Sequence, residues 1–138
     1  MPQGKRHVLD ANVIVSALLL PKSVPRQAFD HALATGRLLL SGPVIAELED
    51  VLRRPRLERY VGERERMRFL VALVREADVV PVTVSIRASR DPKDNKYLEL
   101  AVAGGAATIV SGDHDLLSLN PYRGVRIVTP KAFLEPEG

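Results

Sequence analysis

Short apolar runs alternate along the chain with segments in which apolar residues recur every three or four positions. The short runs predict β-strands, and the three-to-four spacing predicts α-helices between them. A run over 79–84 is a weaker strand, because Pro81 suits the edge of a sheet better than its centre. The other predicted strands are 7–10, 37–41, 107–111 and 126–129, and the predicted helices are 11–20, 23–35, 43–54, 63–77 and 94–103, with a short helical turn over 113–119 and Gly36 just past the end of the second helix.

This alternation of strands and helices indicates βαβ units. Right-handed crossovers then give a parallel sheet with helices on both faces, which is a three-layer α/β fold. The chain has 138 residues and shows no internal repeat or linker, so one domain over 1–138 is expected. Ligands of such folds bind beyond the carboxyl ends of the strands, where Asp10 and the segment 111–115 fall.

Composition narrows the chemistry. The chain has no cysteine, which excludes disulfides, thiolate metal sites and cysteine nucleophiles, so a bound metal must be held by oxygen or imidazole. The apolar runs are too short for a signal peptide or for the roughly 20 residues that span a bilayer, and we expect a cytoplasmic protein. The net charge is +3 and most of the positive charge is arginine, which favours phosphate-rich partners.

Asp94 occupies an unusual place for a charged residue. In the helix predicted over 94–103 it lies on the same stripe as Tyr97, Leu98 and Ala101, so its carboxylate is expected to be buried. An uncompensated buried charge is costly, and this group must be hydrogen-bonded, paired, neutralised or bound to a cation. An equally open alternative is that Asp91, Pro92 and Asp94 cap the start of the helix.

Acidic residues also follow two of the predicted strands. Asp10 ends the first strand, and Asp113 and Asp115 follow the strand over 107–111, where either of them could cap the next helical turn. Strand ends and helix starts would bring Asp10, Asp94 and Asp113 towards one crevice. Clustered anions raise one another's pKa or recruit a cation, and oxygen ligands favour Mg²⁺ or Mn²⁺. Such ions serve phosphodiester hydrolysis, so nucleic acid is a predicted substrate.

The helix over 43–54 carries three further acids. Asp50 points outward, whereas Glu47 and Glu49 border opposite edges of the apolar stripe about equally closely. Periodicity therefore does not choose between these two glutamates.

Four segments, in order, resemble the motifs of the PIN-domain nucleases, and specifically of the VapC-like toxins of toxin–antitoxin pairs. None of the four is specific alone, but four in order at compatible spacing are. Two departures are Ser111, where the family often has threonine, and Ala11, where it often has threonine or serine. The segments are VLDANVIVSALL (8–19), LSGPVIAELEDVLRRPRL (40–57), RDPKDNKYLELAVAGGA (90–106) and TIVSGDHDLLSL (108–119).

The resemblance implies an α/β/α PIN-like fold with a parallel sheet of about five strands, and it assigns Glu47 as the acid of the second motif. It further implies that the catalytic acids hold one or two Mg²⁺ or Mn²⁺ ions, with Asp115 as an additional metal ligand. Arg53 and Arg54, which follow the helix of Glu47, are candidates for contacts with substrate phosphates. The implied catalytic acids are Asp10, Glu47, Asp94 and Asp113, and the residues expected to support them by hydrogen bonds are Asn12, Ser16, Asp91 and Ser111.

The activity implied by the resemblance is endonucleolytic cleavage of RNA by a homodimer, restrained by a small antitoxin protein. The alternatives are an RNA-processing PIN nuclease without an antitoxin and a non-catalytic RNA-binding module. A haloacid-dehalogenase-like phosphatase would need a second aspartate where this chain has Asn12, and a receiver domain would need paired acids after its first strand. Only 4% of the residues are aromatic, so base stacking is not expected to dominate RNA recognition.

Overall fold

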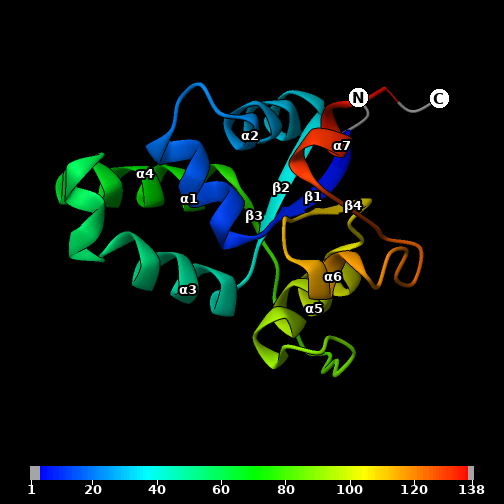
Figure 1. Ribbon diagram of the computed structural model, residues 1–138. Helices are drawn as coiled ribbons and strands as arrows, with labels where there is room; N and C mark the ends of the chain where they lie inside the picture. Colours follow the sequence, from blue (N-terminus) through cyan, green and yellow to red (C-terminus); the bar gives the residue numbers. More distant parts are fainter. Residues whose placement is uncertain (1–3, 137–138) are drawn as a thin grey trace.

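The computed structural model describes residues 4–136, and its centre is a five-stranded parallel sheet (Figure 1). β1 is the middle strand, and its His7 is paired with Leu38 of β2 on one side and with Thr108 of β4 on the other. The predicted parallel sheet is confirmed. The strands are β1 (Lys5–Leu9), β2 (Gly36–Leu40), β3 (Asp78–Val79), β4 (Thr108–Val110) and β5 (Arg126–Val128), in the spatial order β3-β2-β1-β4-β5.

Helices cover both faces of this sheet. The crossovers from β1 to β2 and from β2 to β3 run in one direction along the sheet, so their helices lie on one face, and the later crossovers run in the opposite direction and cover the other. Figure 1 shows α2, from the first crossover, above the sheet and α5, from the crossover between β3 and β4, below it. The last helix, α7, follows β5 and packs against α2 above the sheet. The helices are α1 (Ala11–Leu19), α2 (Val24–Thr35), α3 (Gly42–Leu52), α4 (Glu63–Glu76), α5 (Asn95–Gly104), α6 (His114–Leu117) and α7 (Pro130–Leu134), with 3-10 turns η1 (Pro55–Arg59) and η2 (Pro92–Asp94).

The core is built from the apolar runs that predict the strands. Val8, Leu9, Ile109 and Val110 are buried on the two central strands, as expected when both faces of a parallel sheet are covered. Neither α5 nor any other helix within residues 4–136 is long and apolar enough to cross a membrane.

The direction of the crossovers reverses at β1, and this reversal places the site. Chain segments leave the carboxyl ends of the neighbouring strands β1 and β4 towards opposite faces of the sheet, which is where open α/β sheets bind ligands. Asp10 directly follows β1, and Ser111 directly follows β4.

Two predicted elements differ from the structure. The strand expected over 79–84 is reduced to the two residues of β3, and pairing stops after the Val80 N–H donates to the Leu40 carbonyl, because Pro81 has no N–H to continue it. As predicted for a segment with this proline, β3 lies at the sheet edge. The helix expected from Asp94 begins instead as the 3-10 turn η2, which Asp91 caps, and α5 starts one residue later.

Gly36 lies directly after the end of α2, as predicted, and it is also the first residue of β2. Its φ of 179° is ordinary extended backbone, so its conformation does not require glycine. The need comes from crowding, because a Cβ at this position would lie 1.7 Å from the carbonyl oxygen of Lys5. A glycine here lets β1 and β2 approach each other closely at the start of their pairing.

Candidate functional site

Asp10 connects β1 to α1 and uses both of its carboxylate oxygens. One oxygen accepts the backbone N–H of Val13 at 2.8 Å, which is the N-cap bond of α1. The other accepts the hydroxyl of Ser111, which follows β4. The side chain is buried, with 5% of its residue surface exposed. Asp10 therefore caps a helix and links the carboxyl ends of the two central strands.

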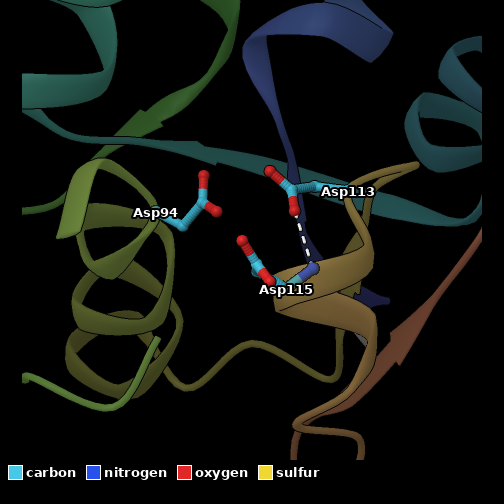
Figure 2. A group of neighbouring side chains, drawn as sticks. All are labelled: Asp94, Asp113 and Asp115. Carbon is cyan, nitrogen blue, oxygen red and sulfur yellow. Dashed lines mark hydrogen bonds between the residues drawn. The ribbon is translucent and has the colours of Figure 1, made fainter. Parts of the chain in front are cut away.

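Ser111 connects Asp10 to the acids that follow it by a chain of hydrogen bonds. Its hydroxyl oxygen accepts the N–H of Asp113 at 2.9 Å, while its proton goes to Asp10. Asp113 in turn accepts the N–H of Asp115 at 2.8 Å and so caps α6, as Figure 2 shows. The departure from threonine at this position thus keeps the hydroxyl that both bonds require.

Asp94 comes from the other side of the site, at the end of η2. Figure 2 shows its carboxylate reaching towards those of Asp113 and Asp115, and one oxygen from each of the three acids lies within 4.8 Å of the others. We call these three residues the acidic cluster. Asp94 is only 8% exposed, which confirms that it is buried, and its Oδ2 has no hydrogen-bond partner among residues 4–136.

The electrostatics of this site favour a cation. Burial, then the contact with Asp113, raises the pKa of Asp94 to about 7. Burial also raises the pKa of Asp10, and the charges of Asp113 and Glu47 add to that rise, although its two hydrogen bonds oppose it. Carboxylate oxygens are ligands of the kind that Mg²⁺ and Mn²⁺ take, and one of those here is buried with no hydrogen-bond partner among the described residues, so the residues present fit such an ion.

Glu47 lies on α3 beside this site and is fixed there by α5. The hydroxyl of Tyr97 donates to Glu47 Oε1 and accepts the backbone N–H of Ala11 at 3.0 Å. Lys96 Nζ lies 3.3 Å from the same Glu47 oxygen. Burial and the bond to Glu47 raise the pKa of Tyr97, so its hydroxyl stays protonated and remains a donor. Glu47 itself is outside the acidic cluster.

The neighbouring acids of α3 point elsewhere. Glu49 accepts from Arg53 at 3.0 Å, and Asp50, with three quarters of its side chain exposed, pairs with Arg54 at 3.3 Å. Of the three acids on this helix, Glu47 is the one whose hydrogen bond connects it to Tyr97 and α1. This is the distinction that the apolar spacing of the helix could not make.

The remaining predicted site residues fall into two groups. Asp91 accepts the N–H of Lys93 at 3.0 Å, so it caps η2 and positions the turn that carries Asp94. Asn12 and Ser16 are not in the acidic cluster; together with Arg54 they line a cavity between α1 and the end of α3. Arg53 does not line that cavity and contacts Glu49 and Glu63 instead.

Tyr97 and Lys96 are site residues that the sequence analysis did not identify. Tyr97 was visible as a member of the apolar stripe of α5, where it looks like a core residue, and it is indeed only 3% exposed. The available signal was its hydroxyl, since a buried tyrosine three positions from Asp94 needs a polar partner. Which partner it finds depends on how α3, α1 and α5 pack.

Comparison with known proteins agrees with this fold. The chain is 29% identical to the uncharacterized protein MJ1680 of Methanocaldococcus jannaschii, over 93% of this chain and 88% of that one. A chain in the crystal structure of VapBC2 from Rickettsia felis, bound to a DNA fragment from their promoter, superposes with a TM-score of 0.62 at 13% identity, over 90% of this chain and 98% of that one. PAE2754 from Pyrobaculum aerophilum superposes with a TM-score of 0.58 at 17% identity, over 94% of this chain and 87% of that one.

The two superpositions show a shared fold, and at these low identities they show no more than that. The family is shown by the sequence itself. The family model of the PIN domain matches residues 6–115. This match runs from β1 to α6 and contains every acid described above. The chain therefore belongs to the PIN domain family.

Proposed function

We propose that this protein is an endoribonuclease that hydrolyses RNA phosphodiester bonds with the help of Mg²⁺ or Mn²⁺. PIN-domain proteins are nucleases, and this domain, which we take to span 1–138, carries the chemistry that such a reaction needs. The observation that supports the proposal most strongly is the acidic cluster, in which Asp94 faces two more carboxylates and its buried Oδ2 has no hydrogen-bond partner in the part of the chain that the structure describes.

Asp94, Asp113 and Asp115 would hold the ion, with Asp10 and Glu47 beside them. A bound divalent ion supplies an activated water and neutralises charge on the scissile phosphate. The role of Ser111 is to fix the carboxylate of Asp10 through its hydroxyl. Partners that orient an acidic ligand in this way sustain metal affinity and activity.

A cleavage assay tests this proposal. Purified protein is incubated with labelled single-stranded RNA in Mn²⁺ or Mg²⁺, with EDTA as the control for metal dependence. Asp10→Asn should reduce cleavage by at least a hundredfold, whereas Asp50→Asn, a change of the same kind at an exposed acid of α3, should leave it near the wild-type rate. Equal cleavage by the Asp10 variant, or cleavage that persists in EDTA, would contradict the proposal, and RNA binding without cleavage by the wild type would support a non-catalytic module instead.

An antitoxin partner is the finer part of the proposal. It is supported by the likeness to a chain of VapBC2, in addition to the motif resemblance. We propose a cytoplasmic homodimer that is inhibited by a small protein, and a small reading frame directly beside the gene is its expected source. Light scattering of the purified protein tests the dimer. Absence of such a reading frame, combined with active nuclease, would favour an RNA-processing enzyme without an antitoxin.

A further inference from the structure

A cavity of about 340 Å³ lies between α1, the end of α3 and η1. Four of its residues, Asn12, Val15, Ser16 and Leu19, form one face of α1, and a helix rises 1.5 Å per residue, so this wall is about 10 Å long. Its Asn12 end is two residues from Asp10. We call this cavity the arginine groove, and its other lining residues are Val51, Arg54, Arg56, Leu57, Arg59 and Tyr60.

The charge of the arginine groove is opposite to that of the acidic cluster. Arg54, Arg56 and Arg59 line it, and none of its described lining residues is acidic. The pair between Arg54 and the exposed Asp50 is a surface pair, which contributes little and can exchange for a phosphate. Within residues 4–136, no carboxylate lies within 4.0 Å of the guanidinium nitrogens of Arg56 or Arg59.

An aromatic ring stands at the same place. Tyr60 is 50% exposed, and the guanidinium carbon of Arg59 lies 5.3 Å from the centre of its ring. Exposed aromatic rings and guanidinium planes are the surfaces on which unpaired RNA bases stack. Tyr60 is thus an exposed stacking surface in a cavity that three arginines also line.

A buried arginine makes this surface rigid. Arg66 of α4 is 1% exposed; its Nε donates to the carbonyl of Leu52 at 2.6 Å, and its Nη1 donates to the carbonyl of Val61. These bonds connect the end of α3 to the segment after η1, so the turn that carries Arg56, Arg59 and Tyr60 is held on both sides. A surface fixed before binding loses less entropy when a ligand arrives.

We propose that the arginine groove binds single-stranded RNA on one side of the cleavage site, with phosphates at Arg54, Arg56 and Arg59 and one base stacked on Tyr60. The inference rests on the proposed nuclease function, because it assumes that the substrate passes from the acidic cluster along α1. Ligand pockets range from roughly 300 to 1,000 Å³, and a cavity at the lower limit accommodates about one nucleotide of an unpaired strand rather than a duplex. The three arginines would therefore contact the phosphates of that nucleotide and of its neighbours along the strand.

Fluorescence anisotropy with a labelled single-stranded RNA tests this inference. The measurement is made in EDTA, so that cleavage does not interfere. A plot of log affinity against log salt concentration has a negative slope, and Arg56→Gln and Arg59→Gln should each make this slope less negative by about 0.7, the value for one phosphate contact on a single strand. Arg123→Gln is the matched control, because Arg123 also lies 5.3 Å from a tyrosine ring, that of Tyr122, but outside the groove.

The stacking contact has its own pair of variants. Tyr60→Ala should weaken RNA binding about tenfold or more, whereas Tyr60→Phe keeps the ring and should bind within about twofold of the wild type. RNA that carries 4-thiouridine should, on irradiation, crosslink to the peptide containing Tyr60. Because this side chain is half exposed, unchanged urea midpoints are expected and exclude unfolding as the cause.

The outcomes separate this inference from the proposed function. If the wild type cleaves RNA while the groove variants keep its affinity and salt slope, or if crosslinks map only elsewhere, the groove assignment is overturned and the nuclease proposal stands. If the wild type neither cleaves nor binds RNA, both are overturned. If the groove variants lose binding to an antitoxin protein but not to RNA, the groove belongs to that partner and the RNA assignment is wrong.

Discussion

Replacing Asp94 by asparagine should stabilise the metal-free protein at high pH and have little effect at low pH. The pKa of Asp94 is about 7 in the folded protein, against an ordinary value of 3.8. The folded state therefore binds the proton more tightly than the unfolded state does. The resulting stabilisation is complete below about pH 4 and is lost as the pH rises through about 7. An asparagine side chain does not titrate in this range, so the Asp94→Asn variant does not lose this stability as the pH rises.

The size of the effect follows from the shift. Each pKa unit corresponds to 1.36 kcal/mol, so a shift of about three units sets an upper limit of about 4 kcal/mol. Asp113 and Asp115 are partly exposed, and water between the carboxylates screens their repulsion, so we expect about half of this limit, about 2 kcal/mol. For a chain of this length that difference corresponds to about 8 °C in melting temperature.

Urea denaturation in EDTA, followed by circular dichroism at pH 4 and pH 8, measures this. His7 also makes the stability depend on pH: burial lowers its pKa to about 4, so its contribution to stability is lost as the pH falls from 6.5 through about 4. Because both proteins contain His7, the difference between variant and wild type reports on Asp94 alone. Asp50→Asn should stay within about 0.5 kcal/mol of the wild type at both pH values, as surface changes usually do. An Asp94→Asn variant that is no more stable than the wild type at pH 8 would refute the reasoning.

Ser111→Ala removes the hydroxyl that donates to Asp10, and calorimetry with Mn²⁺ should show about a 10- to 100-fold loss of affinity; an unchanged affinity would mean that this bond does not orient the site. Tyr97→Phe leaves the backbone N–H of Ala11 without its partner, and urea denaturation should show a loss of about 1–3 kcal/mol; a neutral result would argue against that bond. Arg66→Met should cost about 3 kcal/mol in the same assay, because two carbonyls lose a buried donor; a gain in stability would contradict this. Mn²⁺ should raise the melting temperature more at pH 8 than at pH 5, because protons compete for carboxylates; equal shifts at both pH values would count against a carboxylate site.

Local patterns in the sequence are enough to predict much of this fold. The alternation of short and helical apolar patterns yields all five strands and their parallel arrangement. The spacing that placed Asp94 among Tyr97, Leu98 and Ala101 correctly predicts its burial. The strands and the burial of Asp94 are predictable because each depends on residues within one or two helical turns of each other, and the parallel arrangement follows from the order of strands and helices together with the right-handed crossover rule.

The parts that were not predictable depend on contacts between distant segments. Glu47 and Glu49 border the same stripe, and only the packing of α3 against α5 brings Glu47 to the Tyr97 hydroxyl. Tyr97 itself looks like a core residue until its two hydrogen-bond partners are known. The apolar residues over 79–84 favour a longer strand, whereas the missing N–H of Pro81 ends the pairing of β3 with β2. Where such a strand ends depends on its pairing with the neighbouring strand.

The way Ser111 holds Asp10 also bears on when this protein becomes active during its synthesis. Asp10 leaves the ribosome before its hydroxyl donor and the residues of the acidic cluster, which are made about 100 residues later, or roughly 5–20 s at 5–20 residues per second. A nascent chain that stops before β4 has no second strand end to complete the site. If the protein is the ribonuclease proposed above, it cannot cleave its own messenger RNA until β1 and β4 are paired.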